Sequence, residues 1–473
     1  MSEAVDAVVI GSGPNGLCAA IRLARAGRSV RVYETRDTVG GGARTSALTL
    51  EGFHHDVCSA IHPMAIGSPF LRTLPLEAHG LRWVHPDAPL AHPFDDGPAV
   101  LMERSVAATA EALGRDGRGY RWLMDPMVRR WEALFADGMA PLGLPRSPLL
   151  LARFGARAMW PATWLAKALF REPRARALLA GLAAHAILPL EKPFSSAIGL
   201  MLGVAGHAVG WPMPRGGAQA LSDALASLLR SLGGEIVTGH RVERLDALPT
   251  RGPVLFDTAP RAMLAIAGDA LPDGYARRVR RFRHGPGVFK VDWALAEPIP
   301  WRDPQVARAG TVHLGGTLDE LAVGEREAWR GEHVERPFVL LAQQSLFDDT
   351  RAPAGRHTGW AYCHVPNGST LDRAAVIEAQ VERYAPGFRD CVLARAATNT
   401  EGFEAYNANY IGGDVNGGAP DITQLFTRPV ARRVPYSTPN PRLFLCSAST
   451  PPGGGVHGMC GFFAAEAALR RWP

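Results

Sequence analysis

The sequence lacks the paired cysteines that a redox-active dithiol or a zinc knuckle needs. It holds six cysteines, and none of them stands in a CxxC spacing, which excludes both kinds of site at that spacing. Cys18 and Cys446 fall in segments that we expect to be buried, where a free thiol serves as a small hydrophobic side chain. Unpaired cysteines are typical of a reducing compartment, so we expect a cytoplasmic protein.

The chain also lacks long apolar runs and blocks of positive charge. No uninterrupted apolar stretch approaches the roughly 18 residues of a membrane span, and we expect no signal peptide, because a cationic region and a cleavage site are missing. The net charge is +6, but the arginines occur singly or in pairs without interleaved aromatics. We therefore expect no nucleic-acid partner. With 473 residues, the chain is long enough for two domains.

What the sequence does contain is a dinucleotide-binding fingerprint near its start. We expect a strand at residues 7–10, followed by a tight turn that contains Gly11, Gly13 and Gly16. A helix at residues 17–26 and a second strand at residues 30–33 follow, and the second strand ends on Glu34. Gly11 permits the tight turn, Gly13 lets a diphosphate approach the backbone, and Gly16 lets the helix pack on the strand. The helix N-terminus offers N–H groups to the phosphates, and Glu34 would bind both ribose hydroxyls.

The residues after Glu34 narrow the choice of nucleotide. Gly40-Gly41-Gly42-Ala43-Arg44 completes the pattern E-x5-GG-x-x-R. This pattern resembles the flavoprotein version of the fold, as in amine oxidases and phytoene desaturases, and in those families it implies FAD rather than NAD. The alternative interpretation is a glycine-rich surface loop.

A short polar loop follows at Gly52–Met64. It gathers His54, His55, Asp56, Ser59 and His62. The spacing matches no standard metal site, so we expect no bound metal. The two remaining interpretations are a polar turn and a loop that lines a pocket near the flavin.

Residues 105–202 are expected to be mainly helical. Within them, residues 141–170 are apolar, rich in tryptophan and punctuated by Arg and Lys. Such a segment forms an amphipathic lid or a helix pair on a membrane surface, or else a buried helix hairpin. Peripheral membrane contact is therefore left open.

The pattern of residues 211–285 predicts that the chain re-enters the nucleotide-binding domain here. A helix that ends at paired glycines leads into three short runs that we expect to be strands. The helix is Ala218–Leu232, and the strands are Glu235–Thr238, His240–Leu245 and Pro253–Phe256. Val242 would place its backbone amide and carbonyl against the adenine edge.

Residues 285–431 alternate between extended and helical patterns, which favours a sheet-based substrate domain. Strand patterns cover Gly287–Ala294 and Pro337–Leu346, and a helix pattern covers Ala374–Tyr384. The glycine-rich stretch Tyr410–Gly418 is either a pair of tight turns or a loop that points Asp414 or Asn416 into the substrate pocket.

The C-terminal segment predicts a strand, a loop and a helix. They cover Arg442–Cys446, Ser447–Gly461 and Phe462–Trp472. A glycine run that leads into a helix N-terminus allows an anion to approach closely. This loop would suit the diphosphate and ribityl parts of a flavin and the edge of its ring.

Segments spread over almost the whole chain resemble one family. They are IGSGPNGLCAA, WPMPRGGAQALSDAL with GGEIVTGHRVERL, FEAYNANYIGGDVNGG and PPGGGVHGMCGFFAA. The sequence is similar to the phytoene-desaturase-like flavoproteins, within the group of amine oxidases and protoporphyrinogen oxidase. It is most similar to the subgroup named after pyridine nucleotide-disulfide oxidoreductase domain-containing protein 2. The chain departs from the family at Ser447-Ala448-Ser449, where glycine is more usual, but serine is small enough for FAD to bind.

The resemblance implies an α/β fold with a Rossmann-type FAD-binding domain built from discontinuous segments and a mixed sheet-and-helix substrate domain. The expected FAD-binding domain covers residues 1–100, 211–285 and 437–473, the helical lid 101–210, and the substrate domain 286–436. The expected FAD contacts are Gly11, Gly13, Pro14, Asn15, Gly16, Glu34, Thr35, Gly41, Gly42, Ala43, Arg44, Val242, Ser447, Gly454, Gly455, Val456, His457 and Met459.

The implied activity is dehydrogenation of a lipophilic small molecule, such as an isoprenoid, polyene or polyketide, by hydride transfer to flavin N5. The glycine loop makes His457 the first candidate for a catalytic residue, and Asp414 is the second. The expected substrate pocket includes Asp56, Ser59, His62, Tyr410 and Asn416. Because only one nucleotide fingerprint is complete, we expect O2 or a quinone as electron acceptor.

Two alternatives use the same scaffold. The first is an FAD-dependent amine oxidase or isomerase, and an amine oxidase would need an aromatic cage from Trp360, Tyr362, Tyr406 or Tyr410. The second is a flavin-binding protein without turnover.

Overall fold

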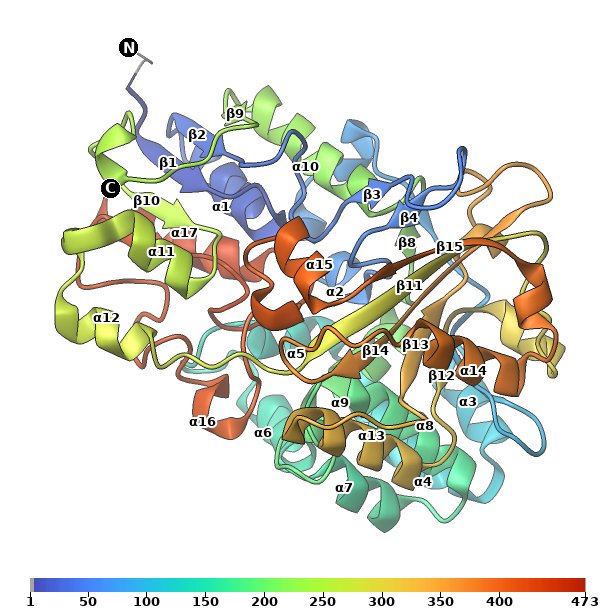
Figure 1. Ribbon diagram of the computed structural model, residues 1–473. Coiled ribbons are helices and arrows are strands. Elements are labelled where there is room, and N and C mark those ends of the chain that lie inside the picture. Colours follow the sequence, from blue (N-terminus) through green and yellow to red (C-terminus); the bar gives the residue numbers. More distant parts are fainter. Residues whose placement is uncertain (1–3, 473) are drawn as a thin grey trace.

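Two sheets divide the structure, which is a computed structural model that describes residues 4–472 (Figure 1). The first sheet is five-stranded and parallel, in the order β16-β10-β1-β2-β9. Its strands are β1 (Ala7–Ile10), β2 (Val30–Tyr33), β9 (Glu235–Val237), β10 (Val254–Phe256) and β16 (Leu443–Leu445). Strands from three distant parts of the chain therefore build one sheet.

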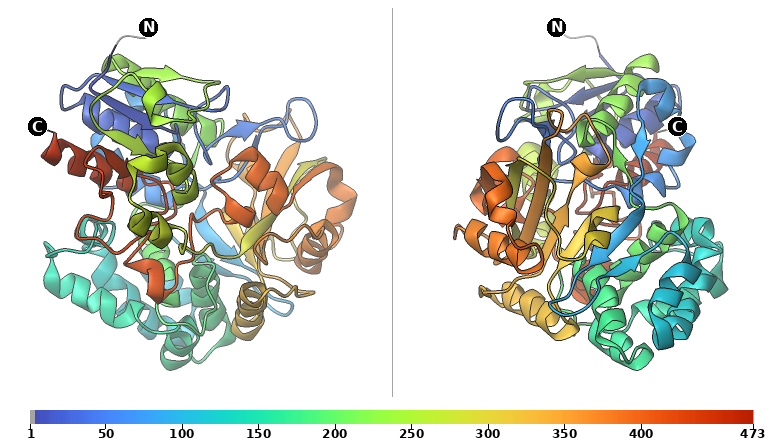
Figure 2. Two further views of the ribbon diagram at one scale, coloured as in Figure 1. Left: turned by 60° about the vertical axis from the view of Figure 1, so that its left-hand side comes forward. Right: turned by 90° about the vertical axis from the view of Figure 1, so that its right-hand side faces the viewer.

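Both faces of this parallel sheet are covered by helices, as the nearly continuous apolar runs of its strands require. Ala7 and Val9 pack toward α1 (Pro14–Ala24), α10 (Ala218–Ser231) and α17 (Met459–Arg471), whereas Val8 and Ile10 pack toward α11 (Pro260–Ala267) and α12 (Asp273–Val279). Figure 2 shows α17 in red beside the blue N-terminal elements. A Cβ atom on Gly461 would lie 1.8 Å from the Asn15 carbonyl oxygen, so α17 packs closely against α1.

The second sheet is seven-stranded and mixed, in the order β15-β11-β14-β13-β12-β6-β7. Its strands are β6 (Ala88–His92), β7 (Val100–Met102), β11 (Gly287–Leu295), β12 (Ala309–Leu314), β13 (Val339–Ala342), β14 (His357–Val365) and β15 (Val392–Thr398). Only the pair β6–β12 is parallel. The outer face packs on α14 (Ala374–Tyr384) and the inner face on α13 (Leu318–Arg330).

A layer of helices completes the end of the molecule that lies away from the parallel sheet (Figure 2). These helices are α3 (Val106–Ala112), α4 (Gly117–Val128), α5 (Trp131–Gly138), α6 (Pro148–Ala158), α7 (Ala162–Leu169), α8 (Pro173–Ala184) and α9 (Ser195–Ala208). Helices α8 and α9 are apolar almost all round and are buried, as expected for helices inside a protein core.

The remaining elements are short. They are β3 (Thr45–Ser46), β4 (His55–Asp56), α2 (Pro63–Ile66), β5 (Trp83–Val84), β8 (Met213–Pro214), α15 (Thr400–Tyr406) and α16 (Ile422–Leu425). Strand β3 pairs with β4, and β5 pairs with β8. In residues 4–472 no helix combines the length and the apolar character needed to cross a membrane.

The α/β class with a Rossmann-type sheet is confirmed, but several sequence-based details are wrong. Strands β6 and β7 pair in the seven-stranded sheet, although residues 1–100 were expected to belong with the nucleotide. Residues 240–245 form no strand, because the chain turns at Gly239 (φ +64°) and passes the end of β2 without a ladder partner. The strand expected at Pro337–Leu346 ends at Ala342, and a 3-10 turn follows at Gln344–Leu346.

Candidate nucleotide and substrate site

One continuous cavity of about 1090 Å³ joins the two sheets. It begins at the carboxyl ends of β1, β2 and β10, where ligands bind in open parallel sheets. It then runs between the inner face of the seven-stranded sheet and helices α5 and α9, with residues 185–188 after α8 also in its wall. A nucleotide and a second small molecule therefore have one connected space.

The glycine turn at the start of α1 leaves no room for side chains. Gly11 has a φ of +101°, and a Cβ atom there would lie 2.6 Å from the Asp257 carbonyl oxygen. A Cβ atom on Gly16 would lie 2.1 Å from the Gly11 carbonyl oxygen. Asn15 lines the cavity, and its Oδ1 atom is buried without a partner among residues 4–472. This cradle fits a dinucleotide diphosphate.

Glu34 is buried at the end of β2 and holds the turn together. Its Oε2 atom accepts hydrogen bonds from the Ser12 amide (3.1 Å) and hydroxyl (2.6 Å), and Oε1 accepts one from the Arg36 amide (2.9 Å). An ionised carboxylate has about four acceptor positions, so about one position remains for a ribose hydroxyl, and Arg44 Nη2 lies 3.4 Å from Oε1. Arg44 donates to the carbonyl oxygens of Thr38, Val39 and Gly41 and thereby shapes the glycine loop.

Most of the predicted FAD contacts line the cavity. They are Gly11, Gly13, Pro14, Asn15, Glu34, Thr35, Gly41, Gly42, Ala43, Arg44, Val242, Ser447, Gly454, Gly455, Val456 and His457. Gly16 and Met459 do not line it: Gly16 packs against Gly11, and Met459 is buried at the start of α17. Contact of these residues with FAD stays a prediction.

Sequence reasoning missed Asp257, which follows β10. Its Oδ2 atom accepts a 2.8 Å hydrogen bond from the Gly16 amide. Burial raises the pKa of this carboxyl to about 7, against the opposing effect of the Gly16 hydrogen bond, and the negative charge of Glu34 adds to the rise. The signal in the sequence was an acid directly after an apolar strand whose end reaches the glycine turn.

The imidazole of His457 is held by its own loop. Its Nδ1 atom accepts a hydrogen bond from the Met459 amide (3.0 Å), and Nε2 donates to the Gly453 carbonyl oxygen (3.2 Å). Burial lowers the pKa of His457 to about 4, so the ring is neutral at pH 7. Both ring nitrogens are engaged within the loop, and His457 also lines the cavity. A catalytic role of His457 stays a prediction.

Asp414 is buried and does not line the cavity. Its Oδ2 atom accepts from the Gly285 amide (3.0 Å) and lies 3.2 Å from His284 Nδ1, while Oδ1 accepts from the Asn416 amide (2.9 Å). The carboxylate thus fixes the glycine-rich turn to the segment that enters β11. A catalytic role of Asp414 stays a prediction.

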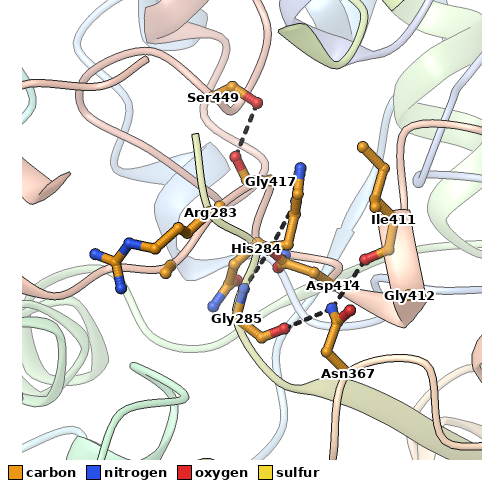
Figure 3. Close-up of polar contacts among 12 residues, drawn as sticks. Arg283, His284, Gly285, Asn367, Ile411, Gly412, Asp414, Gly417 and Ser449 are labelled. Atoms are coloured by element: carbon orange, nitrogen blue, oxygen red, sulfur yellow. Dashed lines mark hydrogen bonds and ion pairs between the residues drawn. The ribbon is translucent and has the colours of Figure 1, made fainter. Parts of the chain in front are cut away.

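Neighbouring contacts tie the same turn to other segments (Figure 3). Asn367 donates to the carbonyl oxygens of Gly285 (2.7 Å) and Ile411 (3.0 Å), and the Ser449 hydroxyl donates to the Gly417 carbonyl oxygen (2.8 Å). The turn at residues 410–418 is therefore hydrogen-bonded both to segments that flank β11 and β14 of the seven-stranded sheet and to the C-terminal glycine loop.

Of the predicted substrate-pocket residues, Ser59, His62, Tyr410 and Asn416 line the cavity, whereas Asp56 does not. Asp56 is fully buried and forms a 2.7 Å ion pair with Arg351, which is equally buried. It also accepts from the Ala218 amide (2.7 Å) and the Thr45 hydroxyl (2.8 Å). Its place in this network is structural, because all of its bonds join chain segments behind the cavity wall.

Sequence reasoning also missed Lys290, the one lysine that lines the cavity among residues 4–472. It lies on β11, is 1% exposed, and pairs with Asp292. Its Nζ atom lies 5.7 Å from the centre of the Trp360 ring. Burial raises the pKa of Asp292 to about 6, and the Lys290 charge opposes the rise. Two charged residues spaced by two in an apolar strand were the available signal.

The comparisons with known proteins agree with this arrangement. A family model described as NAD(P)-binding Rossmann-like domain matches residues 9–72. The rat pyridine nucleotide-disulfide oxidoreductase domain-containing protein 2 is 27% identical over 98% of this chain and 93% of its own. A lycopene-forming phytoene desaturase of Pseudescherichia vulneris is 26% identical over 98% of both chains.

Solved structures share the fold. An oxidoreductase from Methanosarcina mazei has a TM-score of 0.67 at 17% identity, over 98% of this chain and 99% of its own. A putrescine oxidase variant has a TM-score of 0.63 at 16% identity, over 99% of both chains. The resemblance stated from the sequence is thereby confirmed: the chain is similar over almost its whole length to these two relatives, which supports an FAD-dependent oxidoreductase, and it shares the fold of the putrescine oxidase.

Proposed function

We propose that the chain is an FAD-dependent dehydrogenase that introduces a double bond into a lipophilic small molecule. The observation that carries this proposal is the single cavity that leads from the glycine turn to an apolar chamber. Bound FAD would supply the acceptor for a hydride. The chain's own residues bind its diphosphate at the glycine turn, receive its ribose at Glu34, and exclude water from the chamber.

The chamber is suited to an apolar substrate. Its walls include Met139, Ile187, Leu188, Ile198, Met201, Leu202, Val288 and Leu340. Burial of an aliphatic substrate against such walls contributes roughly 25 cal/mol per Å² of apolar surface. Lys290 is part of the cavity wall, where its Nζ atom pairs with Asp292.

The electron acceptor in this proposal is O2 or a quinone. Only one complete glycine fingerprint is present in the sequence, and its turn belongs to the cavity described above. A nicotinamide nucleotide would need a second phosphate cradle of the same kind.

The first experiment is an absorption spectrum of the purified protein, followed by anaerobic photoreduction and exposure to air. We expect the yellow bands of a bound flavin, their bleaching on reduction, and their return with O2. A colourless protein that takes up no FAD would refute the proposal. Flavin that binds but is never reduced by any lipophilic candidate substrate would favour a flavin-binding protein without turnover.

An amine oxidase is the second candidate, and the aromatic residues at the chamber favour it. Trp360, Tyr362, Tyr406 and Tyr410 all line the cavity, and the Trp360 and Tyr362 rings lie 5.2 Å apart at 86°. The carboxylates that line the cavity in residues 4–472 are Glu34, Asp257 and Glu243, all at the nucleotide end. An ammonium group would find no acid in the substrate chamber, and the dehydrogenase is favoured for that reason.

We also propose that the surface around α6 and α7 rests on anionic lipid. Leu144, Leu149 and Trp164 are 101%, 85% and 61% exposed. Residues 138–171 contain five Arg or Lys and no Asp or Glu, a pattern that suits an anionic bilayer surface. Ile198 is exposed beside this surface and also lines the cavity, so a lipophilic substrate would enter from the bilayer. The buried hairpin considered from the sequence does not account for these exposed side chains.

A further inference from the structure

The inner end of the substrate chamber is polar, although its walls are otherwise apolar. His185, which follows α8, and Thr311 on β12 both line the cavity. The Nε2 atom of His185 lies 2.8 Å from Nε2 of His313, which is fully buried behind it on the same strand as Thr311. A pair of hydrogen-bonded histidines therefore lies at the inner end of the apolar chamber.

Several polar atoms at this end have no protein partner. Thr311 and Trp360 are buried residues of the cavity wall. The Thr311 hydroxyl oxygen and the Trp360 indole nitrogen are themselves buried, and neither has a hydrogen-bond partner among residues 4–472. The Nδ1 atoms of His313 and His92, which lie behind the cavity wall, also have no hydrogen-bond partner among residues 4–472. A buried polar group without a hydrogen-bond partner is destabilising. A pure hydrocarbon in the chamber would leave the wall groups unpaired.

The charge at this end is close to zero. Burial lowers the pKa of His185 to about 3, and the neighbouring His364 adds to that effect. Burial and the neighbouring His185 and His92 lower the pKa of His313 as well. The Lys290 and Asp292 charges are paired with each other, and Glu325 is hydrogen-bonded to His364 (2.7 Å). No unpaired charge in the described chain faces the chamber here, so an ionic group of a ligand would stay uncompensated.

We infer that the substrate is an amphiphile whose apolar chain fills the chamber and whose uncharged oxygen function, a hydroxyl or a carbonyl, docks between Thr311, His185 and Trp360. The inference rests on the proposed function, because it concerns the substrate of the same cavity. An oxygen-bearing substrate would distinguish this chain from an enzyme whose substrate is a hydrocarbon polyene. The Thr311 hydroxyl and the His185 ring each donate or accept, and Trp360 donates, so both oxygen functions are accommodated.

The test compares probes that share one carbon skeleton. Farnesol, farnesal, β-farnesene and farnesylamine are titrated into the flavin-loaded protein by calorimetry and by the change in flavin absorbance. We expect farnesol or farnesal to bind at least about tenfold more tightly than β-farnesene and farnesylamine, because a site that hydrogen-bonds an oxygen rejects the analogue without it. Equal binding of alcohol and hydrocarbon, or no binding of either oxygenated probe, would overturn the inference.

Two variants locate the preference. Thr311→Val should reduce the ratio between the oxygenated probe and the hydrocarbon to below about threefold, and His185→Phe should do the same. Thr358→Val is the matched control, because the Thr358 hydroxyl is also buried and unpartnered among residues 4–472 but does not line the cavity. An unchanged ratio in both Thr311→Val and His185→Phe would contradict the placement.

The two proposals fail differently. If the protein takes up no flavin, the same calorimetric titrations are made with the flavin-free protein; a preference for the oxygenated probe there would leave the docking site standing while the proposed function is refuted. If the protein is yellow and reducible but prefers the hydrocarbon, the inference alone is refuted. Retained flavin absorbance in each variant shows that the variant is folded.

Discussion

The backbone N–H of Gly16 donates a 2.8 Å hydrogen bond to the carboxylate of Asp257. A side chain from the end of β10 therefore occupies the positive end of α1, where a phosphate is expected to bind. The carboxylate and an incoming diphosphate carry charges of the same sign, so a protonated Asp257 is the form compatible with a bound dinucleotide.

This relationship predicts that FAD binds with uptake of a proton. The pKa of Asp257 is raised to about 7 without a nucleotide, and an adjacent diphosphate would raise it further. Above that pH, FAD affinity should fall by up to about tenfold per pH unit. Asp257→Asn should bind FAD with little pH dependence, whereas Asp319→Asn, exposed on α13, should behave like the wild type. Fluorescence titration from pH 6 to 9 measures the FAD affinity of the wild type and of both variants. A wild-type affinity that does not change with pH would contradict the prediction.

Glu34→Ala should weaken FAD binding by at least about tenfold, because the ribose loses a charged acceptor worth roughly 1.5–3 kcal/mol. The glycine turn should also loosen, since Glu34 bonds the amides of Ser12 and Arg36. Flavin content after gel filtration measures the loss. Glu111→Gln, on the exposed side of α3, serves as the control, and full flavin occupancy in Glu34→Ala would show that the ribose lies elsewhere.

Lys290→Met should make a bound flavin harder to reduce, because the variant removes a positive charge from the cavity wall. We expect a lower midpoint potential, at about 30 mV for each 1.4 kcal/mol of lost stabilisation of the reduced state. Spectroelectrochemistry measures the shift without any substrate. Lys167→Met, exposed on α7, should leave the potential unchanged, and so should Lys290→Arg to a first approximation.

Asp56→Ala should lower the free energy of unfolding by about 3–5 kcal/mol, because it leaves the Arg351 charge buried without its partner. The ion pair and the other hydrogen bonds hold the pKa of Asp56 below its ordinary value despite burial. Its contribution is therefore complete above the unfolded pKa of about 4 and is lost as the pH falls below it. Denaturant unfolding at pH 7 and pH 3.5 should show a smaller difference between wild type and variant at the lower pH.

Replacing Trp160 and Trp164 by Ala should weaken binding to vesicles of phosphatidylglycerol and phosphatidylcholine by at least about tenfold, because both rings are exposed and such rings anchor proteins at bilayer interfaces. Co-sedimentation measures the bound fraction. Trp472→Ala, at the end of α17, is the control. Equal sedimentation of all three proteins would place the lipid contact elsewhere, and no sedimentation of the wild type would remove it.

The nucleotide part was predictable because its demands are local. Gly11, Gly16 and Glu34 lie within one short βαβ unit, where each residue's role follows from its distance along the chain. The sheet to which β6 and β7 belong was not predictable, since both are short apolar strands. The pairing of β6 with β12 depends on residues far away in the sequence, and β7 joins the sheet by pairing with β6.

The polar residues of the substrate end could not be assigned from the sequence. Lys290 and Thr311 lie in otherwise apolar strands, and each has a second polar residue two positions further on. Only the tertiary structure shows which sheet face meets the cavity. Asp414 was considered as a side chain that points into the pocket. Its direction is set by the hydrogen bond from the Gly285 amide, which no local pattern reveals.

The order of strands in the parallel sheet has a consequence for biosynthesis. The central strand β1 is translated before β16 and α17, which complete the sheet and cover α1. The nascent chain therefore holds β1 and α1 without these partners until the more than 400 residues up to β16 have been synthesised. A chain terminated before β16 would leave the apolar side of α1 that α17 covers exposed to water, as a target for proteolysis.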